Sequence, residues 1–233
     1  MKCEKCGAKL SKEAVFCSSC GAEIVDKEEG SKKILTVLDS LYEKALVGVP
    51  KVSEPVSELA ADYMRKNDTP EEAARSLIKY QVAKCTTSGF VTGLGGLLTL
   101  PVAIPANLTT VWYVQLRMIA AIATIGGYDP SSDQVQTLAY ACLTGQAVTD
   151  IVKGTGIKIG EKITVAALKK LPGTVLTKIN RAVGFRLLTK FGTKGTINLV
   201  KGVPVVGGVV GGAIDFGSTK IIGKNAYRVF IEK

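Results

Sequence analysis

The chain has 233 residues, of which 46% are hydrophobic and only 6% aromatic, and it carries a formal net charge of +10. This length allows one sizeable core plus a small appendage, and the hydrophobic content excludes a disordered chain. Histidine is absent. Its absence excludes Ser-His-Asp and Cys-His catalytic pairs, histidine-based metal triads and acid–base catalysis by histidine.

The positive charge is concentrated in the last third of the chain. Residues 150–233 contain 15 basic and 4 acidic residues, a net charge of +11, whereas residues 1–149 contain 15 basic and 16 acidic residues, a net charge of −1. A basic segment of this kind favours an anionic partner, either phospholipid headgroups or nucleic acid. The alternative is that the lysines only solvate the outer faces of helices.

Four of the six cysteines lie within the first twenty residues. Cys3, Cys6, Cys17 and Cys20 form two C-x2-C pairs separated by ten residues, and a glycine follows each pair. The glycine allows a tight turn, so that two sulfurs can face one ion. We predict one structural Zn²⁺ with four thiolate ligands, which provides the folding free energy of a segment too short for its own core.

Two disulfides are the alternative for these four cysteines, but they require an oxidising compartment. The chain opens on MKCEKCG without an apolar leader, so we expect a reducing compartment and a cytoplasmic location. The segment also resembles the short zinc ribbons at the start of many prokaryotic proteins. The other two cysteines, Cys85 and Cys142, lie in apolar surroundings and are expected to be buried and unreactive.

The chain is expected to divide into a zinc ribbon at 1–25, a polar linker at 26–31 and a helical domain at 32–233. No segment beyond the ribbon shows strand periodicity, so we predict an all-α main domain, a helical bundle with a glycine-rich apolar hairpin. The predicted helices, in chain order, are Ser31 (N-cap) to about Gly48, Ser53–Lys66, a helix capped by Thr69 with Pro70 and Glu72, the hairpin with its second arm at Ala106–Ile125, Asp129–Val148, Ile157–Leu171, Gly173–Phe191 and Val203–Phe230.

The hairpin includes an uncharged run of 32 residues, from Cys85 to Leu116. This run is long enough to cross a bilayer. Its glycines, together with Pro101 and Pro105, argue against a simple span and favour two helical arms joined by a loop. Near the C-terminus, glycines at 207, 208, 211 and 212 have the spacing that lets helices approach closely, and we expect the 89–96 arm to be their partner.

Two charges interrupt long uncharged stretches, Arg117 in the second arm and Asp215 in the last helix. Buried charges are normally paired, so these two residues form a candidate buried ion pair. The alternative is that each marks the point where a helix emerges into water. On the basic helices, Lys169, Lys170, Arg181 and Arg186 are candidate contacts to an anionic surface.

No catalytic residues are predicted, and we expect no enzymatic activity. The glycines at 93–96 lack the third glycine of a dinucleotide-binding loop and the strand that should precede it. A phosphate-binding loop ending at Gly223 and Lys224 would need glycine at Ser218 and a hydroxyl at Asn225. Carboxylates in the helical domain cluster in its first helices, where solvation and helix-start electrostatics explain them.

Two segments resemble the bacterial EcsC family. They are GFVTGLGGLLTLPVAIPANLTTVWYVQLRMIAAIATIGGYD at 89–129 and GVPVVGGVVGGAIDFGSTKIIGKNAYRVF at 202–230, and the resemblance extends over nearly everything after the linker. The family is named after a protein encoded beside the subunits of an ABC exporter. The resemblance therefore implies a membrane neighbourhood and possible linkage to a transport system, without implying a reaction.

These observations favour a non-enzymatic, membrane-associated adaptor, peripheral or partly inserted at the cytoplasmic face, whose ribbon recruits a protein partner. A soluble helical bundle that binds a small apolar ligand or a protein is the first alternative. A nucleic-acid-binding protein is the second, and the scarcity of aromatic residues for base stacking argues against it.

Overall fold

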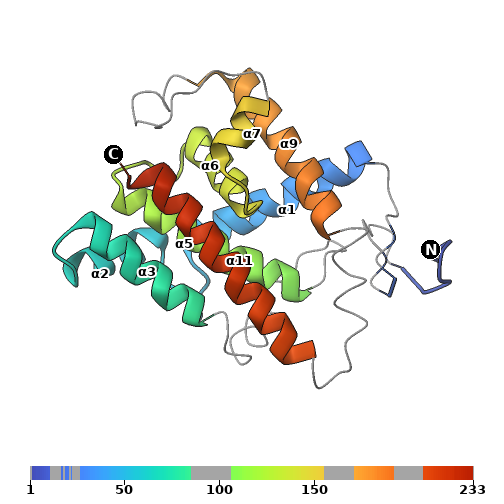
Figure 1. Ribbon diagram of the computed structural model, residues 1–233, viewed down its shortest axis with the longest axis horizontal. Coiled ribbons are helices and arrows are strands. Elements are labelled where there is room, and N and C mark those ends of the chain that lie inside the picture. The colour runs from blue at the N-terminus through green and yellow to red at the C-terminus, as the bar shows by residue number, and fades with distance from the viewer. Residues whose placement is uncertain are drawn as a thin grey trace.

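The computed structural model describes residues 2–10, 17, 19, 20, 22, 27–84, 106–154, 171–191 and 207–232. Within these ranges the chain forms eight α-helices and no strand, apart from two isolated antiparallel bridges. This confirms the predicted all-α main domain. The helices are α1 (Lys27–Val47), α2 (Val56–Arg65), α3 (Pro70–Lys84), α5 (Ala106–Ile125), α6 (Asp133–Leu143), α7 (Val148–Gly154), α9 (Gly173–Phe191) and α11 (Gly207–Phe230) (Figure 1).

Helix α5 lies at the centre of the bundle and contacts α1, α2, α3, α6 and α11. Residues 109–123 of α5 are buried without exception, and the helix lies behind α11 in Figure 1. Its window Leu108–Ile125 is the one stretch in the described helices long and apolar enough to cross a membrane, and 89% of that window is buried inside the protein. A helix that is apolar on all sides must be covered on all sides, and here the other helices cover it.

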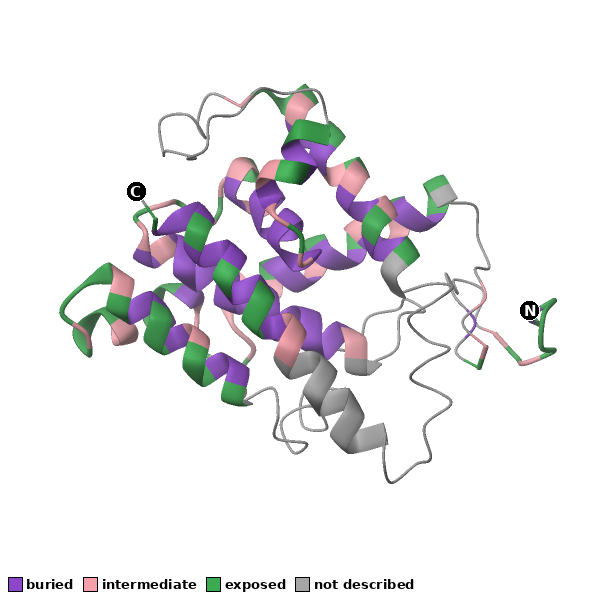
Figure 2. Cartoon of the chain, viewed as in Figure 1, coloured by how far each residue is buried: buried purple, intermediate pink, exposed green. Residues whose placement is uncertain are grey.

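The remaining helices form two groups around α5. Helices α3 and α11 pack against each other, and α2 packs against α3. In the second group, α9 packs against α1, α6 and α7. Figure 2 shows buried residues on the inward faces of these helices and exposed residues on their outer faces. The charged residues of the bundle therefore lie mainly on the outside.

Helix ends follow the predicted caps at α3 and α5. The Thr69 hydroxyl accepts a hydrogen bond from the backbone N–H of Glu72 at 3.2 Å, as expected for an N-cap. At the end of α5, Gly127 has a φ of 81°, and its N–H donates to the Thr124 carbonyl. The Tyr128 N–H donates to the Ala123 carbonyl, which completes a Schellman cap.

The predicted linker at 26–31 is wrong from residue 27 onward, because α1 begins at Lys27. The first turn has no apolar periodicity, but two i,i+4 ion pairs, Glu28 with Lys32 and Glu29 with Lys33, support it. Ser31, the predicted N-cap, lies inside the helix and is only 3% exposed. It fits against Gly184 of α9, where a Cβ atom would collide with the Ser31 hydroxyl.

The single helix predicted at 129–148 is also wrong, because the structure has two helices there. Asp129 forms a turn, accepting a hydrogen bond from the Ser131 N–H at 2.9 Å, and α6 starts only after its N-cap, Ser132. The helix ends at Thr144, and Gly145 follows in the left-handed region at φ 77°. Glycine adopts this conformation readily, so the chain turns before α7.

Several predictions lie outside the described residues. They concern the first hairpin arm, Cys85 and most of the helix predicted at 157–171. The structure gives the backbone of α11 from residue 207, but it does not describe the side chains of 207–216. The predicted contact between the 89–96 arm and the glycines at 207–212 therefore stays a prediction.

Besides Gly184, Gly223 of α11 lies at a close approach between helices. A Cβ atom at Gly223 would lie 2.9 Å from Ile78 Cγ2 on α3 and 3.4 Å from Met118 Cε on α5. At Gly217, in the same helix, a Cβ atom would meet nothing within 4 Å. The two positions therefore separate the effect of packing from that of helix propensity.

We predict that Gly217→Ala stabilises the protein, whereas Gly223→Ala does not. Overpacking at Gly223 should cost about 1–3 kcal/mol, which exceeds or equals the propensity gain of about 1 kcal/mol from replacing glycine with alanine. Gly217→Ala should keep most of that gain. Denaturant unfolding of both variants measures the difference, and a stabilised Gly223→Ala variant would contradict the packing described here.

Candidate zinc centre and cationic groove

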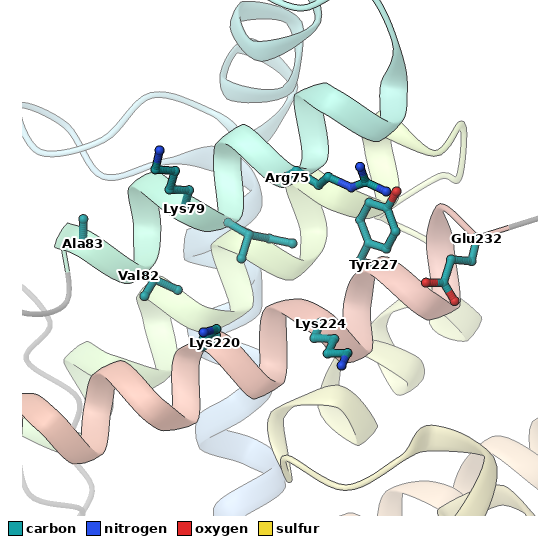
Figure 3. A pocket seen from close by; sticks show the side chains of 9 residues that line it. Arg75, Lys79, Val82, Ala83, Lys220, Lys224, Tyr227 and Glu232 are labelled. Carbon is teal, nitrogen blue, oxygen red and sulfur yellow. The ribbon is translucent and has the colours of Figure 1, made fainter.

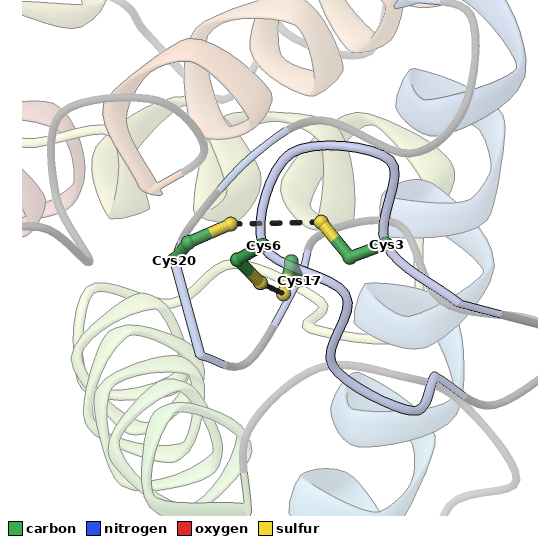
Figure 4. A group of neighbouring side chains, drawn as sticks. All are labelled: Cys3, Cys6, Cys17 and Cys20. Carbon is green, nitrogen blue, oxygen red and sulfur yellow. Dashed lines mark hydrogen bonds between the residues drawn. The ribbon is translucent and has the colours of Figure 1, made fainter.

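The four ribbon cysteines converge on one point (Figure 4). Their sulfur atoms all lie within 4.8 Å of one another, with Cys3 Sγ 3.6 Å from Cys20 Sγ and Cys6 Sγ 3.5 Å from Cys17 Sγ. Four sulfurs at the corners of a tetrahedron with Zn–S bonds of about 2.3 Å would be about 3.8 Å apart. Disulfide sulfurs lie about 2.05 Å apart. The arrangement therefore fits one structural Zn²⁺ and does not contain disulfides.

The two halves of the ribbon are built alike. In the first, CEKCGA, the Cys3 N–H donates to the Ala8 carbonyl at 2.9 Å. In the second, CSSCGA, the Cys17 N–H donates to the Ala22 carbonyl at 2.8 Å. Gly7 makes the first turn possible, because it has a φ of 73°. Each C-x2-C-G-A unit thus closes on itself and presents two sulfurs to the same ion.

The electrostatics of the sulfurs also fit a bound cation. Burial disfavours the Cys17 thiolate, but hydrogen bonds from the backbone of Cys20 and Ser19 and from neighbouring thiols lower its pKa to about 6. At Cys6, a backbone hydrogen bond from Ala8 favours the thiolate, whereas the other thiols and burial raise its pKa to about 12. Four thiolates this close repel one another, and a divalent ion removes that repulsion.

Outside the ribbon, Cys142 is fully buried, and its burial raises the pKa of its thiol well above the usual range. This agrees with the predicted unreactive thiol.

Arg117 is partnered, and its described partner is Glu54 in the loop between α1 and α2. The guanidinium donates to the Glu54 carboxylate at 2.9 Å and to the Glu54 carbonyl oxygen at 2.7 Å. The Arg117 side chain is 8% exposed and that of Glu54 is 49% exposed. One turn earlier on α5, the Tyr113 hydroxyl hydrogen-bonds the Ser53 hydroxyl at 2.5 Å. Arg117 and Tyr113 together fix this loop to α5.

The other predicted site residues are only partly described. The side chain of Asp215 lies outside the described residues, so its pairing with Arg117 is untested. Lys169 and Lys170 also lie outside them. Arg181 and Arg186 are both exposed on α9, and Arg181 lies 3.8 Å from Glu28 of α1.

A groove between α3 and α11 was not predicted from the sequence. It has a volume of about 670 Å³, and its apolar lining residues are Ile78, Val82 and Ala83 of α3 and Tyr227 of α11. Four cations line it as well, Arg75, Lys79, Lys220 and Lys224, and Glu232 is the one acidic residue among its described lining residues. Val82 and Lys220 face each other at one end, and Arg75 lies beside Tyr227 near Glu232 at the other (Figure 3).

The sequence contains a signal for this groove, but only half of it. Arg75 and Lys79 are spaced i,i+4, as are Lys220 and Lys224, so each pair occupies one face of its helix. Periodicity does not tell which helices are neighbours. Lys79 and Lys220 are 141 positions apart in the sequence. The two basic faces meet only because α3 packs on α11.

These features define a protein with a four-cysteine zinc ribbon followed by an all-helical domain. The chain belongs to the EcsC protein family, whose family model matches residues 67–231, and a zinc-ribbon domain matches residues 2–24. No curated protein and no solved structure matches it. The family match begins just before α3, so α1 and α2 precede it, although both pack against α5 in the same core.

The zinc assignment predicts one Zn²⁺ per reduced chain. Cys17→Ser should lower the stoichiometry to well below one, because removal of one of four ligands opens the site. Cys142→Ser is the matched control, since it changes a buried thiol outside the ribbon and should leave the zinc content at one. Metal analysis by mass spectrometry checks both, and a zinc-free wild type or a fully loaded Cys17→Ser variant would contradict the site.

Proposed function

We propose that this protein is a non-enzymatic adaptor that binds peripherally to an anionic membrane surface at the cytoplasmic face and recruits a protein partner through its zinc ribbon. The observation that carries this proposal is the outer face of α9. The helix contains four basic residues and no acidic residue, and Lys178, Arg181 and Arg186 are exposed on it. Arg181 lies 3.8 Å from Glu28 of α1, so Lys178 and Arg186 are the cations of this face best suited to anionic headgroups.

The apolar face of α9 is already used inside the bundle. Leu176, Ile179, Val183, Leu187 and Leu188 are buried, and the helix packs on α1 and α6. Attraction to a membrane through this helix would therefore be electrostatic and reversible. Each Lys or Arg near an anionic surface contributes about 1 kcal/mol, so several are needed for stable binding.

The burial of α5 supports peripheral binding in preference to a span. Its apolar side chains contact other helices, and its Arg117 is held by Glu54. Moving this helix into lipid would remove the core of the bundle. The proposal therefore assigns the membrane contact to outer faces of the domain.

The ribbon supports partner recruitment through what it exposes. Cys3 and Cys17 are buried, whereas Glu4, Lys5 and Lys9 of the ribbon are exposed. A zinc site with four thiolates has no open position for chemistry, so its role is to hold this small surface in shape. Ribbon cysteines that are not joined in disulfides also suit a reducing compartment.

The proposal predicts that Lys178→Glu/Arg186→Glu sharply reduces binding to vesicles that contain phosphatidylglycerol. Binding of the wild type should weaken as salt rises, because exposed charges are screened within about 8 Å at physiological ionic strength. The matched control is Lys66→Glu/Arg228→Glu, which makes the same charge change at two exposed positions, one directly after α2 and one on α11. It should bind nearly as the wild type does in a vesicle co-sedimentation assay.

Equal binding of the wild type to neutral phosphatidylcholine vesicles at high salt would contradict electrostatic docking. Tighter binding to duplex DNA than to anionic vesicles would favour the nucleic-acid alternative instead.

A further inference from the structure

The groove between α3 and α11 combines an apolar floor with a cationic rim. Its volume of about 670 Å³ falls within the range of roughly 300–1,000 Å³ found for small-molecule sites. Its floor comes from the last two turns of α3, where Val82 is 6% exposed and Ala83 is exposed. This combination fits a ligand that has one apolar chain and one negative charge.

No described carboxylate forms an ion pair with the cations of the groove, Arg75, Lys79, Lys220 and Lys224. Among the described lining residues, Glu232 is the only acidic one. Four cations against one carboxylate leave a positive field over an apolar surface, which attracts an anion and favours its retention.

We propose that this groove binds a long-chain fatty acid, with the carboxylate held by Lys220 and Lys224 and the chain lying over Ile78, Val82 and Ala83. This function goes beyond membrane docking by α9, because it requires no membrane. Lysine ammonium groups on a flexible stem can follow a carboxylate without a fixed geometry.

The two ends of the groove determine the orientation of the ligand. At one end, the Arg75 guanidinium lies over the Tyr227 ring, 5.3 Å from its centroid, and Glu232 is nearby. A carboxylate there would be repelled by Glu232. At the other end, Val82 and Ala83 provide apolar surface opposite Lys220 (Figure 3). The carboxylate therefore lies at Lys220 and Lys224, away from Glu232, and the chain extends toward the C-terminal end of α3.

A single chain fits this site better than a membrane phospholipid. The close contact between Gly223 and Ile78 brings α3 and α11 together, and the apolar lining is limited to Ile78, Val82 and Ala83 of α3 and Tyr227 of α11. The second acyl chain of a phospholipid would remain in water, where it would lose the hydrophobic contribution of its burial.

Calorimetric titration of the zinc-loaded full chain with oleate, below its micelle-forming concentration, tests the proposal. We expect one oleate per chain, and at least about tenfold weaker binding of the uncharged methyl ester. Lys220→Glu/Lys224→Glu should weaken oleate binding by about tenfold or more. Ala83→Trp, at an exposed position that tolerates a large side chain, should block the apolar end and also weaken it.

The α9 variant Lys178→Glu/Arg186→Glu is the matched control and should bind oleate as the wild type does. This separates the two proposals, because loss of vesicle binding with intact oleate binding affects only the proposed membrane docking. Unchanged oleate affinity in Lys220→Glu/Lys224→Glu or in Ala83→Trp would overturn the groove assignment. Absence of oleate binding would overturn it as well. This holds even if the groove residues turn out to bind phosphatidylglycerol vesicles.

Discussion

The need to cover α5 on every side determines the arrangement of the helical domain. Several of the largest fully buried side chains belong to this helix, namely Trp112, Tyr113, Leu116, Met118 and Ile119. Transferring such apolar surface out of water contributes about 25 cal/mol per Å², so the chain gains most by packing its other helices around α5. The buried Gln115 of α5 also has a partner on a covering helix, because its side-chain amide donates to the Thr219 hydroxyl of α11 at 3.0 Å.

This arrangement leaves the outer faces of the covering helices for function. Most described apolar residues of α9 and α11 face inward, with Ile221 as an exposed exception, and the described lysines and arginines of both helices are exposed. The groove between α3 and α11 is a second consequence, because the two covering helices meet at Gly223 and leave an apolar strip beside the contact. The zinc ribbon is independent of these constraints, since four sulfurs and one ion supply its core.

The parts of this structure that depend on local chemistry could be predicted from the sequence. The zinc ligands follow from cysteine spacing and the glycine after each pair. The bounds of α5 follow from Pro105 before it and the two glycines after it, and α3 follows from the cap at Thr69. The parts that depend on neighbours could not be predicted. Glu54 is 63 residues from Arg117, and no periodicity connects them.

The incorrect boundaries have a similar physical origin. The first turn of α1 is stabilised by ion pairs and by the fit of Ser31 against Gly184, neither of which is visible as an apolar pattern. The break between α6 and α7 depends on the conformation of one glycine, Gly145. In each case tertiary contacts or a single backbone angle decided where a helix begins or ends.

Amide hydrogen exchange of the full chain, in solution and with anionic vesicles, tests most directly the claim that α5 is the protein-covered centre of the domain. The account predicts that amides of residues 111–123 exchange slowest in solution, through global unfolding, and keep that protection when vesicles are added. Fast exchange of these amides in solution, together with protection that appears only with vesicles, would show that lipid covers α5 and would contradict the account.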